Sequence, residues 1–514
     1  MNPIQHIFHK TLSIESMLPK SMSHEELPSG KAMYSKYIRM AIPSVLEMVL
    51  ISLINMADTV MVSGLGTDAV AAVGLVGQPR FIMLCFFWAI STGITAVVAR
   101  RKGEERQEDA NLALRNTLVI TAILSVVLCA IFLPFSDALM LFAGAEEGRT
   151  LRDASDYFLI IGFALPFNAV SMIICAAQRG AGNTKLTMVV NITSNLVNIL
   201  FNYLLINGIG PFPLLGVQGA AIASFIGLFA GFVLSIISLM RGKSKKRFLL
   251  LQKTDSWKID RTATMDVIRI SAASMVEQIC LRIGFFSYAK IVANLGTDAF
   301  AAHQIDMQFL SLSFSFADGL GVAGTALVGQ MLGKERKDLA YIYGTLAQRF
   351  ALIVSIFIAT GCMLGRSFLV GMFITEPEKI TVAALANQEA VHSVAELFMP
   401  IESIIQCFRQ EGVRYMAETV MLIVGIFQPF QMVATVVSGA LRGAGDVKYT
   451  ARVMALTVTL IRPGLAIAAV LLLKDTDIRL ALAGAWLASL TDMVLRMILV
   501  LRRYKKGKWQ DIKV

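Results

Sequence analysis

Asp58 is the residue whose type and position most directly indicate chemistry. It lies within the apolar run from Leu50 to Val62. A carboxylate at bilayer depth is costly and typically marks an ion or proton site. Such a group can carry a proton in one state and pair with a cation in another, which would couple ion flow to transport. The alternative is an aspartate near the end of its helix, solvated by lipid head groups, because Gly64 follows within two turns.

A row of asparagines forms a second polar feature. The amides recur at i, i+4, i+7 and i+11, which places them on one helix face: Asn191, Asn195, Asn198 and Asn202. They either bond neighbouring helices or line a wet cavity together with Asp58. Asn and Asp oxygens suit either Na⁺ or a proton relay, and the residues do not choose between these ions.

The second half of the chain carries charges of both signs within apolar segments. They are Glu277, Arg282, Lys290, His303, Asp306, Asp318 and Arg462. Buried acids and bases tend to pair, and the candidate pairs are Glu277 with Arg282 and Asp306 with Lys290. His303 either titrates near neutral pH or is a structural histidine.

These polar groups stand out because the chain is otherwise strongly apolar. Of its 514 residues, 56% are hydrophobic and only 16% are charged, and the mean hydropathy is +0.65. Soluble domains are nearer a quarter charged. The net charge of +11 comes from basic residues in short loops between apolar runs, which fits the cytoplasmic face of a membrane protein and not a nucleic-acid-binding surface. No CxxC, HExxH, GxSxG or Walker A pattern occurs, so we expect neither an enzyme nor an ATP-driven pump.

About twelve segments are predicted to span a bilayer as helices, each of which needs roughly 20 apolar residues. They are 38–63, 76–99, 117–142, 156–178, 186–207, 216–240, 268–294, 301–332, 346–374, 415–440, 450–473 and 480–501. Every basic cluster in the loops follows an even-numbered span. The positive-inside rule therefore places both termini in the cytoplasm of a multi-pass cell-membrane protein.

The two halves of the chain repeat one another. At an offset of 230, the segment 65–69 (LGTDA) recurs as 295–299, and Glu47 matches Glu277. At an offset of 263, the segment 179–182 (RGAG) recurs as 442–445. The change of offset indicates about 33 extra residues in the second half, and we assign them to an insertion near 376–410.

The repeat predicts an all-α polytopic membrane protein with two six-helix lobes. A pseudo-two-fold axis along the membrane normal relates such lobes, as in parallel-repeat transporters. The predicted parts are a cytoplasmic N-terminal tail (1–36), an N-lobe (37–240), a basic cytoplasmic linker (241–263), a C-lobe (264–503) and a cytoplasmic C-terminal tail (504–514). The substrate path then lies between the lobes, and repeated lobes permit rocking between inward-open and outward-open states.

The chain resembles the multidrug and toxic compound extrusion (MATE) family over nearly its whole length, from about residue 36. The matching stretches are 57–59 (ADT) before 65–66 (LG), 215–221 (LGVQGAA), 301–304 (AAHQ), 327–330 (LVGQ) with Gly333, and both RGAG segments. The resemblance implies twelve helices in two V-shaped lobes and antiport of organic cations against Na⁺ or H⁺.

The resemblance also implies a polar site in the N-lobe. An Asp on helix 1, two positions on helix 5 and a hydroxyl on helix 6 correspond to Asp58, Asn198, Asn202 and Ser224. Asn202 stands where the family often has Asp, which removes one carboxylate. Asp58, Asn198 and Asn202 are the candidate Na⁺ ligands. Glu277 matches a Glu that many members carry on helix 7.

The remaining candidates for cation or substrate binding are Glu47, His303, Asp306 and Asp318. Some sodium-coupled members have an Asp on helix 10 where this chain has Gln431, a departure that weakens a C-lobe sodium site of that type. Asp306 and Asp318 are the candidates to compensate.

Two functions follow as hypotheses. The first is a secondary active exporter of small amphipathic organic cations, in which Asp58 and Glu277 bind substrate or the coupling ion, H⁺ or Na⁺. The alternative is a flippase for lipid-linked oligosaccharides or another anionic substrate, which fourteen helices and a strongly cationic cavity would favour. No cofactor beyond the coupling ion and no nucleic-acid partner is expected, and the predicted form is a monomer in the lipid bilayer.

Overall fold

The computed structural model describes residues 17–19, 26–240, 248–252, 257–373 and 394–512, and the elements in these ranges are helical. The first half contains α2 (Gly30–Ser63), α3 (Thr67–Gly103), α4 (Gln107–Phe132), η2 (Leu133–Phe135), α5 (Ser136–Ala143), α6 (Arg149–Gly180), α7 (Thr184–Asn207) and α8 (Gly216–Met240). The second half contains α9 (Arg261–Ala293), α10 (Thr297–Gly333), α11 (Lys337–Gly371), α13 (Val394–Gly443), α14 (Val447–Met454), the π-helix η3 (Ala455–Ile461), α15 (Arg462–Leu473), α16 (Ile478–Lys505) and η4 (Lys508–Asp511).

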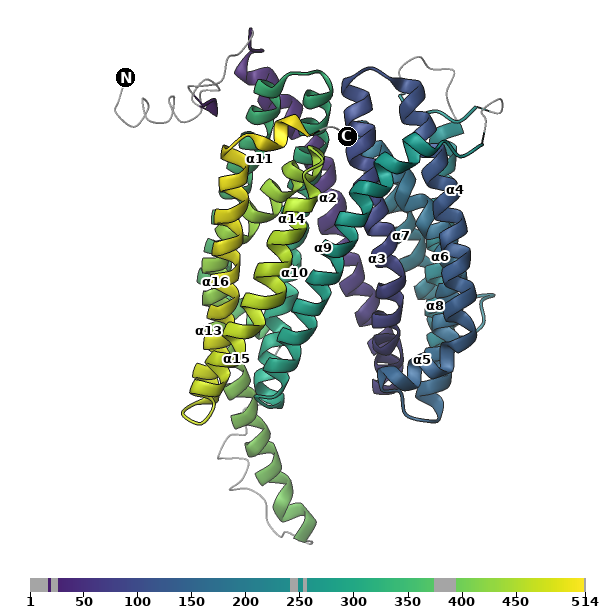
Figure 1. The fold of residues 1–514 in the computed structure, drawn as a ribbon. Helices are drawn as coiled ribbons and strands as arrows, with labels where there is room; N and C mark the ends of the chain where they lie inside the picture. The colour runs from purple at the N-terminus through teal and green to yellow at the C-terminus, as the bar shows by residue number, and fades with distance from the viewer. Residues whose placement is uncertain (1–16, 20–25, 241–247, 253–256, 374–393, 513–514) are drawn as a thin grey trace.

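In the described part of the chain, 11 helical segments are long and apolar enough to cross a membrane. Helix α9 is as long as its neighbours, at 33 residues, but carries Arg269, Glu277, Arg282 and Lys290. It lies among the other helices and packs lengthwise on α3 (Figure 1). The predicted all-α membrane fold of about twelve long helices is confirmed.

Several helices differ from the predicted spans at their ends. The third span is split, because Pro134 cannot continue α4 and the chain passes through η2 into α5. Helix α11 begins at Lys337 and not at 346, since the charged Lys337 and Asp338 lower the mean hydropathy of its first turns. Of the insertion assigned to 376–410, residues 376–393 lie outside the described ranges. From Val394 the chain is helical and continuous with α13, which extends beyond the ends of the other helices (Figure 1).

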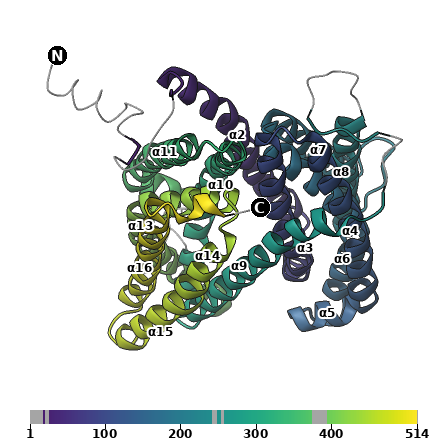
Figure 2. The same ribbon diagram turned by 45° about the horizontal axis from the view of Figure 1, so that its top comes forward.

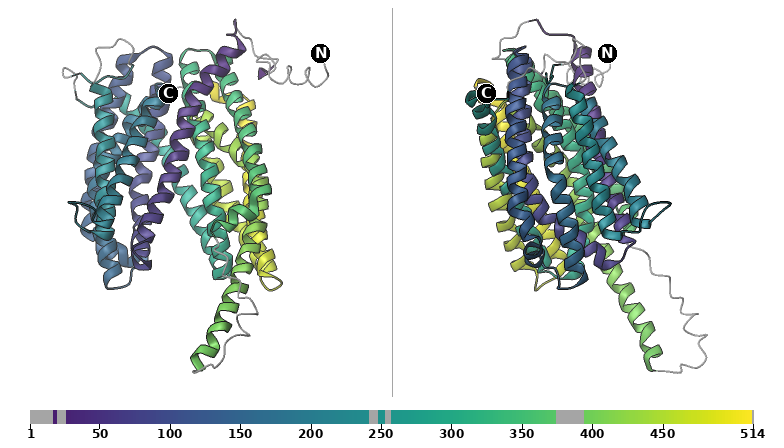
Figure 3. Two further views of the ribbon diagram at one scale, coloured as in Figure 1. Left: turned by 180° about the vertical axis from the view of Figure 1, so that it is seen from behind. Right: turned by 90° about the vertical axis from the view of Figure 1, so that its right-hand side faces the viewer.

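The helices form two lobes, one from α3 to α8 and the other from α10 to α16 (Figures 1 and 3). Helices α2 and α9 run diagonally between them. Helix α2 packs on α10 and α7, while α9 packs on α3 and α14. We call the end where α2 begins and η4 lies the tail side, and the opposite end the far side. The ribbons of the two lobes approach one another at the tail side and diverge toward the far side (Figure 3).

The internal repeat is visible in the backbone and its contacts. Glu105 and Glu335, which match at the offset of 230, are the described non-glycine residues with positive φ, +61° and +60°. The hydroxyl of Thr95 donates to the Ala176 carbonyl at 2.9 Å, and Thr325 donates to Gly439 at 2.8 Å. These contacts occupy the same place in the two lobes, because each partner is shifted by the offset of its segment.

The lobes touch closely on the tail side at two matched glycines. A Cβ on Gly103 would overlap the backbone of Gln330 and Gly333, and a Cβ on Gly333 would overlap that of Arg100 and Gly103. The C-terminal ends of α3 and α10 therefore meet backbone to backbone. One apolar core lies within α2 to α8 and another within α9 to α16. Two further cores bridge the halves, one joining α2 to α10, α11 and α13 and the other joining α3, α4 and α6 to α9.

Candidate functional site

Four of the predicted site residues meet in the N-lobe. Asp58 on α2 is half-buried, and the Asn202 amide on α7 donates to its carboxylate at 2.9 Å. Asn198 lies one turn earlier on α7 and contacts Ser224 on α8 at 3.0 Å. The carboxylate thus sits where three helices converge, and its hydrogen-bond donor is an amide and not a cationic side chain.

The Asn198 amide orientation follows from its neighbours, since oxygen and nitrogen are assigned from the hydrogen-bond network. In the orientation that satisfies both ends, the amide nitrogen donates to the two Asp58 oxygens at 3.0 and 3.1 Å, and the amide oxygen accepts from the Ser224 hydroxyl at 3.0 Å. Asn198 and Asn202 then both donate to Asp58. The Asn202 Oδ1 atom is buried and has no hydrogen-bond partner among the described residues.

Asp58 opens onto a polar cavity of about 300 Å³ inside the N-lobe. Its polar lining is Asn55, Arg80, Tyr157, Asn168, Ser171, Asn191, Ser194, Asn195, Asn198 and Ser224, from α2, α3, α6, α7 and α8. An adjoining cavity of about 190 Å³, lined mainly by apolar side chains of α2, α3 and α8, also reaches Asp58 and Asn202. Asp58 therefore faces space for a small cation, water or part of a substrate.

Arg80 is the cavity residue that the sequence reasoning missed. It lies near the start of the predicted span 76–99 and faces the same cavity as Asp58, close enough for electrostatic interaction with that carboxylate. The available signal was a lone base within an apolar run, which inside a membrane typically faces a cavity or another charge. Tyr157 and Asn168 on α6 gave no comparable signal.

The row of four asparagines on α7 contributes to two separate polar clusters, one around Asp58 and one around Glu47. Asn191 donates at 2.5 Å to Glu47, which also accepts from Thr187 at 2.8 Å and pairs with Arg179 at 3.1 Å. Glu47 is fully buried and lies eleven residues before Asp58 on α2, which is about 16 Å along a helix. The Glu47 carboxylate is therefore not part of the Asp58 site. Both interpretations of the row hold, since the amides bond neighbouring helices and line the cavity.

Glu277 has two matching partners in the C-lobe, and its predicted pairing with Arg282 is wrong. It is fully buried, pairs with Arg442 at 2.9 Å and accepts from Thr450 at 3.1 Å. Arg442 and Thr450 match the Arg179 and Thr187 partners of Glu47 at the offset of 263. A residue five positions along a helix does not share a face with the first, so Arg282 points elsewhere and lies over the Phe81 ring, 3.0 Å from its centroid.

The remaining C-lobe candidates are spread over separate places. Asp306 on α10 is fully buried, and neither carboxylate oxygen has a hydrogen-bond partner among the described residues. The predicted pair with Lys290 is therefore not formed, and Lys290 is exposed. Asp318 is exposed although its neighbours on α10 are buried, and it lies within electrostatic range of Glu277. These residues are not part of the Asp58 site.

His303 is enclosed by aromatic rings in the C-lobe core. Its ring centroid lies 5.6 Å from Tyr288, 6.0 Å from Phe300 and 5.3 Å from Trp486. Its Nδ1 atom is buried without a hydrogen-bond partner in the described part of the chain. His303 thus packs as a core residue, one helical turn from the buried Asp306.

Arg462 takes part in the most buried ion pair of the C-lobe. Its guanidinium donates to Asp492 on α16 at 2.6 and 3.0 Å. Arg496 lies farther from the same carboxylate, at 3.8 Å. Arg462 and Asp492 are almost fully buried. This pair joins α15 to α16 and has no access to the N-lobe cavity.

The described residues contain no cluster of three or more His, Cys, Asp or Glu side chains that could hold a metal ion. An ion at Asp58 would instead meet one carboxylate and neutral oxygens. The unpartnered Asn202 Oδ1 and the Asp58 carboxylate fit a monovalent cation or a proton better than a divalent ion, which typically takes more carboxylates.

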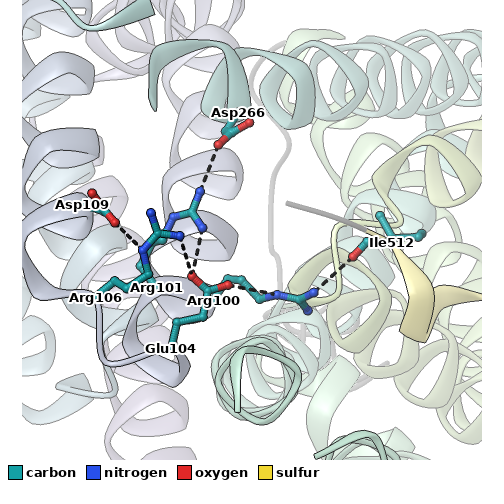
Figure 4. Close-up of polar contacts among 7 residues, drawn as sticks. All are labelled: Arg100, Arg101, Glu104, Arg106, Asp109, Asp266 and Ile512. Carbon is teal, nitrogen blue, oxygen red and sulfur yellow. Dashed lines mark hydrogen bonds and ion pairs between the residues drawn. The ribbon is translucent and has the colours of Figure 1, made fainter. Parts of the chain in front are cut away.

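Polar contacts link the lobes on the tail side (Figure 4). Arg101 on α3 pairs with Asp266 on α9 at 3.1 Å and with Glu104 at 2.9 Å. Arg100 donates to the Ile512 carbonyl at 3.3 Å. Gln330 on α10 donates to the Gly180 carbonyl of α6 at 2.9 Å. Together with the glycine contact, these bonds close the tail side between the lobes.

Comparisons with known proteins match this architecture. The MatE family model matches residues 43–204, 273–401 and 390–467, more than half of the chain. A relative from Thermotoga maritima, named "Probable multidrug resistance protein NorM", is 26% identical over 498 residues, 96% of this chain and 96% of the relative.

Solved structures share the fold. A transporter of the MOP superfamily from Pyrococcus furiosus aligns with a TM-score of 0.78 and 18% identity, over 95% of this chain and 100% of that one. An outward-facing multidrug resistance MATE family transporter aligns with a TM-score of 0.76 and 18% identity, over 94% of this chain and 100% of that one. At these identities the structures show the two-lobed fold alone.

Proposed function

The chain belongs to the MatE family of membrane transporters, and from this premise we propose that it is a secondary active exporter of small amphipathic organic cations. As a family member it is a multi-pass membrane protein of the multidrug efflux class and not an enzyme. The proposal adds the charge of the substrate and the coupling to an inward flow of H⁺ or Na⁺.

The observation that carries the proposal is the Asp58 carboxylate in its cavity. Two neutral amides donate to it, and the cavity of about 300 Å³ gives a ligand access. A carboxylate whose hydrogen-bond donors are neutral amides keeps its negative charge for a cation. An organic cation and a coupling ion would therefore compete for one group, which is how one site exchanges them.

The same oxygens serve either coupling ion in this proposal. A proton would neutralise Asp58 directly. A sodium ion would be held by the Asp58 carboxylate and by Asn202 Oδ1, the buried oxygen without a partner in the described part. Either ion removes the charge that attracts the substrate, so its arrival at Asp58 releases the substrate.

Rocking of the two lobes supplies the change of access in this proposal. The contacts of Gly103 with Gly333, of Arg101 with Asp266 and of Gln330 with Gly180 support a state closed on the tail side. The basic loops favour a cytoplasmic tail side by the positive-inside rule. This conformation would then be open toward the outside, and the inward-open state would require these contacts to break.

The bacterial relative supports a plasma-membrane location. We propose that both termini are cytoplasmic and that a single chain, as a monomer in the bilayer, completes the transport path. The cavity that carries Asp58 is lined by helices of the first half of one chain, α2, α3, α6, α7 and α8.

Export of an anionic substrate is the second candidate, and Arg80 favours it. Its guanidinium lines the same cavity as Asp58. The cavity therefore offers one charge of each sign, where a cavity built for anions would be dominated by bases. This balance supports the organic cation as the first choice.

Efflux from cells tests the proposal. Cells that express the protein are expected to accumulate less ethidium than cells with an empty vector, and the difference should vanish when the gradient of the coupling ion is removed. Varying external pH at fixed sodium, and sodium at fixed pH, identifies the ion. If well-folded protein lowers no cationic dye but lowers accumulation of an anionic dye such as a carboxyfluorescein, the second candidate replaces the first.

A further inference from the structure

A second cavity lies where α9 packs against α3 and α4, away from Asp58. It has a volume of about 200 Å³ and is lined by α3, α4 and α9, with Phe86, Ile90, Ile120, Val267, Ile268 and Met275 as its main apolar walls. Ile268 and the neighbouring Ala272 are exposed, so the cavity opens at the outer surface of the bundle. Figure 2 shows α9 passing beside α3 and α4 in this region.

The floor of the cavity is a tight helix crossing. A Cβ on Gly93 of α3 would overlap the Ser271 hydroxyl and the Val267 carbonyl of α9. The two backbones therefore cannot approach further to close the space. The cavity exists because the side chains around it are too small to fill it, and not because the helices are loosely packed.

The internal repeat shows what such a space otherwise contains. At the offset of 230, the cavity corresponds to the junction of α2, α10 and α11, where Tyr37 replaces Val267 and Phe350 replaces Ile120. Tyr37 is fully buried, stacks on Phe350 with centroids 5.1 Å apart, and donates to the Leu320 carbonyl at 3.1 Å. Two aromatic rings thus fill the junction of α2, α10 and α11, whereas the matching junction of α9, α3 and α4 contains the open cavity.

The chemistry of the cavity favours an acyl chain. An apolar cavity of about 150 Å³ stays dry and takes up an apolar ligand, and this one is larger and faces the lipid-exposed surface. Arg261 lies on the same stripe of α9 as Thr264, Ile268 and Met275, toward the tail side, and it is exposed. An arginine at this position can donate charge-assisted hydrogen bonds to the phosphate of a lipid whose acyl chain lies along these residues of α9.

The loop before α9 supports the same orientation. Trp257 is 51% exposed and Ile259 is 53% exposed, with Lys258 between them. Tryptophan and lysine at the end of a membrane helix are typical of the head-group region. The nearby Asp260 side chain is engaged in capping α9, where it accepts from the Ala263 amide at 2.8 Å.

We propose that the cavity between α3, α4 and α9 is a binding site for a phospholipid of the tail-side leaflet. One acyl chain occupies this cavity, whose counterpart in the other half of the repeat is filled by Tyr37 and Phe350. The phosphate of the lipid binds Arg261. Because α9 runs between the lobes and packs on both α3 and α14, the lipid lies where this connecting helix meets the N-lobe.

Native mass spectrometry of the purified full-length protein with added phosphatidylglycerol tests the site. Val267→Tyr, which copies Tyr37, is expected to lose one retained lipid, while the matched control Ile283→Tyr, at an exposed position on the same helix, keeps it. Thr264→Tyr copies Tyr34 at the mouth of the cavity and provides a second variant should Val267→Tyr fail to fold. Arg261→Gln should weaken phosphatidylglycerol binding by about tenfold, as the loss of a charge-assisted contact predicts.

The proposal is overturned if folded Val267→Tyr or Thr264→Tyr retains as many lipids as the parent protein. It is equally overturned if the Ile283→Tyr control loses the same lipid, since the effect would then not depend on the cavity. Unchanged phosphatidylglycerol affinity in Arg261→Gln would contradict the assignment of the phosphate. The readout is lipid binding, so it is independent of whether the transport proposal holds.

Discussion

Asp58→Asn is expected to lower ion-driven efflux of ethidium by at least about tenfold, the change in rate that a loss of ~1.4 kcal/mol produces. The substituted amide preserves the size of the side chain but removes the charge for which substrate and coupling ion would compete. Its neighbours Asn198 and Asn202 donate to the carboxylate, and an amide offers them only one acceptor oxygen. The measurement is the initial efflux rate from loaded cells at equal amounts of protein in the membrane.

The control for this variant is the same substitution elsewhere in the same half of the chain. Asp68→Asn changes an exposed aspartate in the first turn of α3 and should leave the efflux rate close to that of the parent. If Asp58→Asn transports at the parent rate while folding normally, Asp58 has a structural role and the coupling group lies elsewhere. The buried Asp306, without hydrogen-bond partners in the described part of the chain, would then be the next residue to test.

Arg442→Gln is expected to destabilise the protein by about 3 kcal/mol, because breaking a buried ion pair leaves an uncompensated charge. The remaining Glu277 is fully buried and would keep only the Thr450 hydroxyl of its two observed partners. Arg179→Gln should have a similar effect through Glu47, since the two sites match in the repeat. The measurement is thermal unfolding of the purified proteins in one detergent.

The double variant Glu277→Gln with Arg442→Gln provides the test of the mechanism. Removing both charges should recover most of the lost stability, because no unpaired charge remains, and the interaction energy follows from the double-mutant cycle. Strictly additive losses would contradict the pair as the source of the effect. A crossed double variant, Glu47→Gln with Arg442→Gln, should show no recovery.

Hydropathy and the internal repeat were sufficient to predict the two-lobed helical fold. Eleven helical segments of the described chain carry an apolar stretch of bilayer length, and α9, which carries several charges, was predicted from its match to α2 in the repeat as much as from hydropathy. Helix ends were less predictable. The polar first turn of α11 from Lys337 and the break at Pro134 depend on hydrogen bonding and turn geometry, to which a hydropathy average is insensitive.

The side-chain pairs could not be predicted from local sequence patterns alone. Glu277 pairs with Arg442, which lies 165 residues away, and the prediction with Arg282 used only nearness along one helix. The signal for the correct partner was present, because Glu47 and Glu277 repeat, as do Arg179 and Arg442. Asp58, Asn198, Asn202 and Ser224 were grouped through family resemblance, and the structure brings them together. Arg80 has no repeated counterpart and was missed, since position 310 is Leu.

Competition between ethidium and the coupling ion for Asp58 is the most direct test of the account. The dissociation constant of ethidium for the purified protein is measured by fluorescence polarisation, first with rising sodium at fixed pH and then with falling pH at fixed sodium. We expect that one of these ions weakens ethidium binding to the parent protein and has no such effect on Asp58→Asn. Binding to the parent that neither ion changes, or an identical ion dependence in Asp58→Asn, would contradict it.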